Sequence, residues 1–248
     1  NELSYNASCY IGEGISVTYT DQHKVSILPW KQFQKRMMTD EEIEHYKDKA
    51  SGLAIICGHI SEGLEVIDID CKYDLTGKLF ETLMEQVGPL IDKLTISKTI
   101  SGGYHLYYRC DTIEGNQKLA NRYASDQELE SNPHQKQFVL IETRGEGGYV
   151  VAPPSPGYSW LQGDADSIQF ISKSERENLH AICRSLNEVS DIIRHQPNPM
   201  TDKSYGLTPL DDYNQRGDTI QLLTDNGWTI VRTQGNKVFL RRPGKTEG

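Results

Sequence analysis

Apolar and polar residues alternate along three segments of the chain, 64–70, 104–109 and 138–144. This period of two is typical of a β-strand with one buried face and one polar face. Side chains at positions i and i+2 of a strand point to the same side. In the first segment, "LEVIDID", Asp68 and Asp70 therefore share a face, while two isoleucines occupy the opposite, core-facing side. Aspartate is costly to bury without a partner, so this placement requires a chemical reason.

The other two segments carry similar residues on their polar faces. His105 lies on the polar face of the second segment, and Glu142 and Arg144 share a face of the third. If the three strands are neighbours in one sheet, three carboxylates converge, and they repel one another unless a cation neutralises them. Hard oxygen ligands favour Mg²⁺ or Mn²⁺ over zinc. The pattern therefore predicts a divalent metal site formed by Asp68, Asp70 and Glu142, of the kind used in two-metal phosphoryl or nucleotidyl transfer.

Polar groups near this predicted site are suited to binding a triphosphate. His105 and Arg144 are candidate phosphate binders or charge stabilisers, and Lys98 precedes a Ser-Gly-Gly turn by three residues and adds a point charge. Ser101 and the glycine amides of that turn can donate hydrogen bonds to phosphate oxygens. Lys98, Ser101, His105 and Arg144 are therefore the predicted nucleotide-binding residues. Taken singly, each motif has an ordinary structural explanation, and the functional interpretation depends on their ordered combination.

The remaining pattern predicts further strands and helices in an α+β fold. Strands are expected at 14–21, 52–59, 94–100 and 149–155, and helices within 39–49, 76–94 and 172–193. Residues 111–137 are predicted to form a polar loop. Residues 196–209 contain three prolines and few apolar residues, which predicts a linker. The chain is therefore expected to form one domain over 1–196, followed over 197–248 by the linker and a small αββ segment.

Composition limits the class of protein. No apolar run approaches 18 residues, so no membrane-spanning helix is expected. Five widely spaced cysteines without a Cys-x-x-Cys motif favour reduced thiols in a cytosolic protein and no zinc site. The net charge of −9 argues against a large nonspecific nucleic-acid surface, although a local basic groove remains compatible with it.

The order of the motifs "GLEVIDID", "TISGGYHLYY" and "VLIETRGEGGYVVAPPSPGYSW" strongly resembles the N-terminal catalytic domain of bifunctional DNA primase–polymerases, in the archaeo-eukaryotic primase superfamily. The resemblance covers roughly Gly14 to Asn187. The family's acidic pair on a strand matches Asp68 and Asp70, and its nucleotide-contacting histidine matches His105. Its acidic residue at a strand end matches Glu142, where many members carry Asp, so this position departs mildly from the family pattern.

The resemblance implies a modified RNA-recognition fold, in which an antiparallel sheet with helices on one face is joined to a second α/β unit. It implies a DNA primase and DNA polymerase that uses two Mg²⁺ or Mn²⁺ ions, (d)NTPs and a single-stranded DNA template. Such proteins are encoded by phages, plasmids and mobile elements, and the expected location is the cytoplasm of a bacterial host. The C-terminal end "RRPGK" suggests a connection to a further helicase or DNA-binding region.

Two other classes of function fit parts of the pattern. A metal-dependent nuclease also uses clustered carboxylates, and it would shorten a labelled strand instead of extending it. A non-catalytic replication-initiator module could retain a vestigial site. The complete set of three carboxylates and His105 argues against such a vestigial site, because crowded carboxylates are unfavourable without a bound cation.

Overall fold

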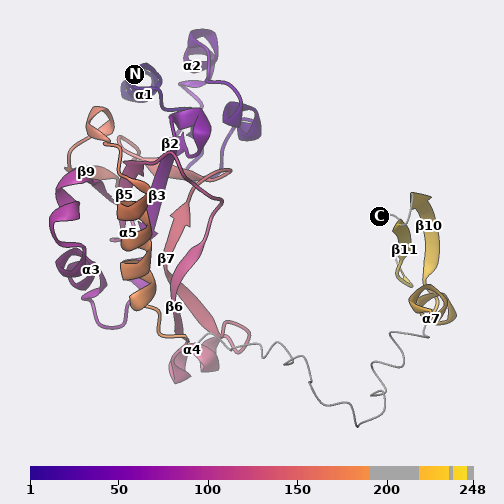
Figure 1. Cartoon of the computed structure of the whole chain (residues 1–248). Coiled ribbons are helices and arrows are strands. Elements are labelled where there is room, and N and C mark those ends of the chain that lie inside the picture. Colours follow the sequence, from indigo (N-terminus) through magenta and orange to yellow (C-terminus); the bar gives the residue numbers. More distant parts are fainter. Residues whose placement is uncertain (190–217, 235–236, 245–248) are drawn as a thin grey trace. The chain divides into compact units, whose positions relative to one another are not determined.

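The chain divides into two compact units, residues 1–191 and 192–248, and the computed structural model describes residues 1–189, 218–234 and 237–244 (Figure 1). The fold is a mixed α+β arrangement with antiparallel sheets and several helices, as the sequence predicted. Among the described residues, no helix has the length and apolar character needed to cross a membrane. The predicted linker, 196–209, lies outside the described residues.

A six-stranded antiparallel sheet forms the centre of the first unit, with strand order β6-β7-β3-β5-β4-β9 (Figure 1). Its strands are β3 (Leu64–Ile69), β4 (Thr95–Lys98), β5 (Tyr104–Arg109), β6 (Lys118–Tyr123), β7 (Gln137–Arg144) and β9 (Ser159–Gln162). The three segments with period-two alternation are β3, β5 and β7. They are adjacent, and β3 lies between the other two.

The register of this sheet brings the polar residues into one row. Asp68 of β3 pairs with His105 of β5 on one side and with Glu142 of β7 on the other. Ser97 of β4 continues the row beyond His105. Residues paired across antiparallel strands share a face, so these four side chains lie on the same side of the sheet.

Helices cover the opposite side of the six-stranded sheet. Ile67 and Ile69 of β3 pack there into a core cluster that includes Leu83 of α3 (Leu79–Val87) and Leu179 of α5 (Lys173–Ser185). Helix α5 begins with a capping box between Ser172 and Glu175, which satisfies amide groups that its first turn leaves free. A 3₁₀ helix, η4 (Gly88–Lys93), follows α3 and leads into β4.

A second sheet contributes to the other core cluster, on the polar-row side. It contains β1 (Val17–Thr20), β2 (Gly52–Ile56) and β8 (Tyr149–Ala152), in the order β1-β2-β8. The side chains of Val66 and Tyr107, from the six-stranded sheet, belong to the same core cluster as this smaller sheet. Around it lie α1 (Glu2–Gly12), α2 (Asp40–Tyr46) and the 3₁₀ helices η1 (Trp30–Gln34), η2 (His59–Ser61) and η5 (Ala165–Ser167).

A buried ionic cluster joins α5 to the sheet. Glu65 of β3 has a fully buried side chain and accepts hydrogen bonds from Arg176 Nε (2.5 Å) and Nη2 (2.9 Å). The hydroxyl of Tyr108 donates to Glu65 at 2.7 Å, and His180 Nε2 lies 2.9 Å from that hydroxyl oxygen. Burial alone would raise the pKa of Glu65, but the hydrogen bonds from Arg176, His180 and Tyr108 outweigh it and lower the pKa to about 2.

The predicted polar loop over 111–137 is wrong in part. The region contains the edge strand β6 and a short helix, α4 (Asp126–Ser131). Strand β6 carries mostly polar residues and two register irregularities against β7, so alternation was too weak to reveal it. Helix α4 has a capping box between Ser125 and Glu128, which was visible in the sequence.

The second unit contains α7 (Thr219–Asp225) followed by a hairpin of β10 (Thr229–Gln234) and β11 (Lys237–Arg241).

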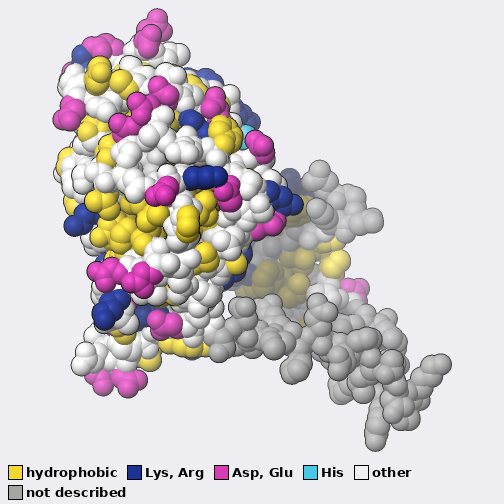
Figure 2. All heavy atoms as spheres, turned by 60° about the vertical axis from the view of Figure 1, so that its left-hand side comes forward, with side chains coloured by type: hydrophobic (Ala, Val, Ile, Leu, Met, Phe, Trp, Pro, Cys, Tyr) yellow, Lys and Arg dark blue, Asp and Glu magenta, His cyan; other side chains and the backbone are white. Residues whose placement is uncertain are grey.

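The two units differ in net charge. Residues 1–189 carry 18 Lys and Arg against 28 Asp and Glu, a net charge of −10. Acidic side chains are spread over the face of the first unit shown in Figure 2. The described residues of the second unit carry four Lys and Arg against two Asp, a net charge of +2.

Candidate active site

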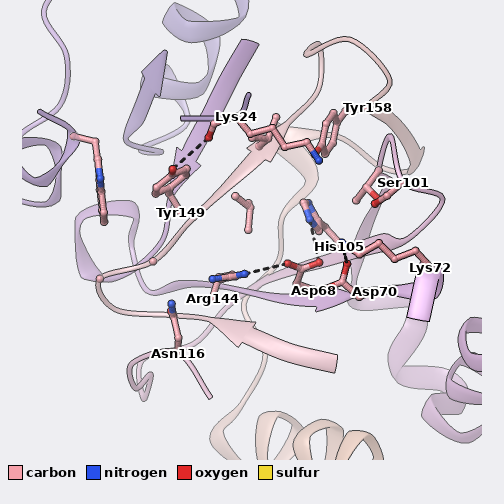
Figure 3. Close-up of a pocket in the computed structure, with 16 residues that line it drawn as sticks. Lys24, Asp68, Asp70, Lys72, Ser101, His105, Asn116, Arg144, Tyr149 and Tyr158 are labelled. Carbon is pink, nitrogen blue, oxygen red and sulfur yellow. Dashed lines mark hydrogen bonds and ion pairs between the residues drawn. The ribbon is translucent and has the colours of Figure 1, made fainter. Parts of the chain in front are cut away.

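A cavity of about 440 Å³ is lined by residues of both sheets of the first unit (Figure 3). Asp68, His105 and Arg144 reach it from β3, β5 and β7 of the large sheet. Residues 149–151 of β8 line it from the small sheet. The cavity therefore lies over the middle of the polar row, at Asp68 and His105.

Three carboxylates meet at this place. One oxygen each from Asp68, Asp70 and Glu142 lies within 4.8 Å of the others. Asp68 is within β3, and Asp70 follows its last residue and begins the 3₁₀ helix η3 (Cys71–Tyr73). The backbone amide of Asp70 donates to Leu140 O of β7 at 2.9 Å, which fixes the second aspartate beside the strand that carries Glu142.

The nitrogen-bearing side chains of an arginine, a histidine and a lysine surround the carboxylates. Arg144 Nη2 donates a hydrogen bond to Glu142 and lies 3.6 Å from Asp68 Oδ2. His105 Nε2 lies 3.5 Å from Asp68 Oδ1, and Lys72 Nζ lies 3.3 Å from Asp70 Oδ1. Figure 3 shows Arg144 directed at Asp68 from the left and His105 from above.

The pKa shifts of the carboxylates show that these nitrogen groups neutralise them unequally. Burial raises the pKa of Asp68, but the hydrogen bond from His105 and the charge of Arg144 outweigh burial and leave it lowered. Burial and the charge of Asp68 raise the pKa of Asp70, despite Lys72. Burial also raises the pKa of Glu142, and the two aspartates add to this against the opposing effect of Arg144. Two of the three carboxylates are therefore unfavourable as anions in their own surroundings.

This donor set fits a divalent cation. Carboxylate oxygens are the ligands of Mg²⁺ and Mn²⁺, and three of them within 4.8 Å of one another can contact a common ion or two neighbouring ions. A cation there would also remove the repulsion that raises the pKa of Asp70 and Glu142. The group can therefore hold a divalent metal.

His105 is held by a chain of hydrogen bonds along the polar row. Its Nδ1 lies 3.1 Å from the hydroxyl oxygen of Tyr107, which in turn lies 2.9 Å from Ser97 Oγ. All three side chains are buried. Because Nδ1 is engaged by Tyr107, the ring directs Nε2 towards Asp68 and the cavity.

The structure brings most of the predicted nucleotide-binding residues together. Ser101, His105 and Arg144 line the cavity. Ser101 Oγ lies 3.2 Å from Thr99 Oγ1 within the turn between β4 and β5. Lys98 is exposed and pairs with Tyr104, whose ring stacks on Phe80 of α3, so Lys98 lies on the helix side of the sheet and does not line the cavity. Its contact with a nucleotide stays a prediction.

Lys24 and Tyr158 are among the cavity residues that the sequence analysis missed. Lys24 Nζ lies 5.6 Å from the centre of the Tyr158 ring, and that ring lies 6.1 Å from the ring of His105. Figure 3 shows Lys24 and Tyr158 side by side above His105. Arg144 and Lys72 have carboxylate partners in the cavity, whereas no carboxylate of the described residues lies within ion-pair distance of Lys24. Lys24 is thus a cation available to an anionic ligand.

The backbone around Lys24 is specifically shaped. Lys24 has a positive φ of 67°, and the Asp21 carboxylate accepts hydrogen bonds from the amides of His23 (2.8 Å) and Val25 (2.9 Å) on either side of it. The hydroxyl of Tyr149 donates to Lys24 O at 3.3 Å. A left-handed conformation is uncommon for lysine, and here it presents the side chain to the cavity. Asp21, three residues before the left-handed position at Lys24, was the available sequence signal for a turn.

Comparison with known proteins agrees with this geometry. No curated protein sequence matches the chain significantly. The family model described as bifunctional DNA primase/polymerase, N-terminal, matches residues 7–174. This range includes both sheets, the three carboxylates and every residue that lines the cavity. The chain therefore belongs to the family of bifunctional DNA primase/polymerase N-terminal domains.

Proposed function

We propose that the first unit catalyses template-directed nucleotidyl transfer, in which a 3′-hydroxyl attacks the α-phosphate of an incoming (d)NTP. The observation that carries this proposal is the convergence of Asp68, Asp70 and Glu142 at a cavity that also presents cationic side chains. Carboxylates suit divalent metal ions, and cations suit a triphosphate. A site for metal and triphosphate together is what a primase or polymerase requires.

The carboxylates would hold the metal ions. Asp68 and Asp70 come from β3 and its end, and Glu142 comes from the neighbouring β7, so the ligands are supported by paired strands of one sheet. When bound, two Mg²⁺ or Mn²⁺ ions would favour loss of the hydroxyl proton and neutralise the charge of the departing pyrophosphate. No nucleophilic side chain is required in this scheme.

The other cavity residues would position the triphosphate. His105 Nε2 is fixed by the contact of Nδ1 with Tyr107 and can donate to a phosphate oxygen when protonated. Arg144 is shared between Asp68 and Glu142 and can turn one guanidinium edge to phosphate. Lys24 supplies a positive charge without a carboxylate partner, and Ser101 supplies a hydroxyl at the rim.

The wider setting of the protein is a further part of the proposal. The six-stranded sheet with helices on one side and the smaller sheet on the other is interpreted as the archaeo-eukaryotic primase fold. Residues 1–196 would form the catalytic domain, and 197–248 would connect it to a helicase or DNA-binding region. The protein would act in the cytoplasm of a bacterial host, encoded by a phage or a mobile element.

Primer extension tests the proposal. A labelled primer on a single-stranded DNA template is incubated with (d)NTPs and Mg²⁺ or Mn²⁺, with the same template unprimed in parallel. Asp68→Ala or Asp70→Ala should lower the extension rate by at least about 100-fold, because each removes a metal ligand. Asp92→Ala, which removes an exposed aspartate of η4, serves as the matched control and should leave extension unchanged.

Each outcome separates the alternatives. Products longer than the primer that depend on Asp68 support nucleotidyl transfer. Metal-dependent products shorter than the primer, with or without (d)NTPs, would identify a nuclease instead. Near-normal extension by both aspartate variants would refute the assignment of the metal ligands.

A further inference from the structure

The hairpin of the second unit has a hollow face of its own. A cavity of about 740 Å³ is lined there by residues of β10, β11 and the segments next to them. The lining consists of three arginines, two aromatic residues and two aliphatic residues: Arg232, Arg241, Arg242, Trp228, Phe239, Val231 and Leu240. No acidic residue contributes to it within the described part of the chain.

Arginine and aromatic side chains are placed together on this face. Arg232 of β10 pairs with Phe239 of β11, and the guanidinium carbon of Arg232 lies 4.3 Å from the centre of the Phe239 ring. Arg242 follows the last residue of β11, and both Arg232 and Arg242 are exposed. One exposed arginine therefore stacks near an aromatic ring, and a second exposed arginine lines the same cavity.

The same face leaves apolar side chains in contact with solvent. The strand register shifts between Ile230 and Arg232, which makes Val231 an extra residue on β10. Val231 is 52% exposed and Phe239 is 39% exposed. In the described residues of so small a unit, such exposure together with arginines indicates a binding surface.

The chemistry of this face fits a flexible polyanion with flat apolar parts. A protein partner would need carboxylates placed opposite the arginines. Single-stranded nucleic acid supplies a partner for both kinds of side chain. Its phosphates can contact guanidinium groups, and its bases can stack on aromatic rings and on arginine. The charge contrast between the units favours the same ligand, because the net charge of residues 1–189 is −10 and repels a phosphate backbone, whereas the described second unit carries +2.

We propose that this arginine-aromatic face, defined by Trp228, Arg232, Phe239 and Arg242, binds single-stranded nucleic acid. Arg232 and Arg242 contact phosphates, and bases stack on the exposed ring of Phe239 and on the partly buried ring of Trp228. Since both units belong to one chain, a strand bound at this face would be tethered to the first unit. The inference goes beyond the proposed function, because a strand can bind at this face whether or not the first unit transfers nucleotides.

Binding of a fluorescein-labelled 20-nucleotide oligothymidine to the full chain, measured by anisotropy at several salt concentrations, tests this inference. The double variant Arg232→Ala/Arg242→Ala should reduce the slope of log affinity against log salt by about 1.4, which is ~0.7 for each lost phosphate contact on a single strand. Phe239→Ala should weaken binding by roughly 5-fold or more through lost stacking. Quenching of tryptophan fluorescence on binding should be largely lost in Trp228→Phe.

Matched variants separate the alternatives. Lys35→Ala/Lys173→Ala removes two exposed cations from the first unit and should leave the affinity within about 2-fold of the unmodified chain. Asp68→Ala should bind the oligonucleotide normally even if it extends no primer, so a failure of the proposed function would be distinguishable. The inference is overturned if the unmodified chain does not bind the strand, or if the arginine variant keeps both affinity and salt slope. It is equally overturned if the arginine variant changes only the oligomeric mass of the protein and not DNA binding.

Discussion

The ionic cluster behind the candidate site gives the most quantitative prediction, for the variant Glu65→Gln. Glutamine keeps the size of the side chain but removes the charge that Arg176 and Tyr108 contact. The pKa of Glu65 falls from 4.5 to about 2, since the hydrogen bonds from Arg176, His180 and Tyr108 outweigh the opposing effect of burial. At about 1.36 kcal/mol per pKa unit, this shift corresponds to ~3 kcal/mol of stability at neutral pH. A similar loss, about 3–5 kcal/mol, is typical when one partner of a buried ion pair is removed.

The sign of the pH dependence follows from the direction of the shift. A carboxyl whose pKa is lower in the folded state stabilises the fold above its unfolded pKa and loses this contribution as pH falls towards the folded pKa. For Glu65 the contribution is complete near pH 7, has decreased by about 0.8 kcal/mol at pH 4 and by about 2 kcal/mol at pH 3. The difference in unfolding free energy between the unmodified chain and Glu65→Gln should therefore decrease as the pH falls from 7 to 3.

Urea unfolding followed by circular dichroism, at pH 7 and at steps down to pH 3, measures this difference. Glu177→Gln is a matched control on the same helix, because Glu177 is 61% exposed and lies 3.8 Å from Lys173. An exposed pair of this kind contributes less than about 1 kcal/mol. The reasoning is refuted if Glu65→Gln lies within about 0.5 kcal/mol of the unmodified chain at pH 7, or if the difference does not change between pH 7 and pH 3.

Three further predictions concern the candidate site. Mg²⁺ or Mn²⁺ at about 100 times its Kd should stabilise the chain by ~2.7 kcal/mol and raise its Tm in differential scanning fluorimetry, and Asp70→Asn, or EDTA, should abolish the rise. Lys24→Ala should raise the KM for the incoming nucleotide about tenfold or more with a smaller change in kcat, whereas Lys35→Ala, on an exposed part of the first unit, should change neither. Gly103→Ala should destabilise the fold by about 2 kcal/mol in urea titrations, because its Cβ would lie 2.2 Å from the last carbonyl oxygen of β3. Gly12→Ala, with nothing within 4 Å of the added Cβ, should shift stability by less than about 1 kcal/mol.

The side of each strand that carries the site was predictable from the sequence, because alternation depends on local geometry alone. The placement of Asp68 opposite Ile67, and of Glu142 opposite Ile141, follows from the period of two. The order of the strands in the sheet did not follow from this alternation. That β3 lies between β5 and β7, with Asp68 in register with both His105 and Glu142, is set by long-range pairing. The convergence of the carboxylates was therefore a conditional prediction until the sheet order was known.

Residues delivered by turns escaped the sequence analysis. Lys24 reaches the cavity from a turn after β1, and Tyr158 from the residue before β9, so no periodic pattern connects them. Asp74, in the loop before α3, is another residue that periodicity does not reveal. Its carboxylate accepts hydrogen bonds from the amides of Thr76 (2.9 Å) and Leu79 (2.8 Å), which fixes the start of α3. Such roles depend on where the backbone turns, which hydrophobic periodicity does not encode.

Strand β3 carries acidic residues on both faces, and the two faces differ in how their charge is balanced. On the helix side, Arg176 and Tyr108 donate hydrogen bonds to the Glu65 carboxylate, and the pKa of Glu65 is lowered to about 2. On the cavity side, Asp70 keeps a raised pKa in spite of its cationic neighbour, as does Glu142 of β7. A carboxylate whose charge the protein itself satisfies stabilises the fold. Carboxylates that remain crowded and incompletely neutralised at a cavity lower the stability of the free protein, and a bound cation reverses that loss. The contrast supports a structural role for the helix-side cluster and the proposed ligand-binding role for the cavity-side cluster.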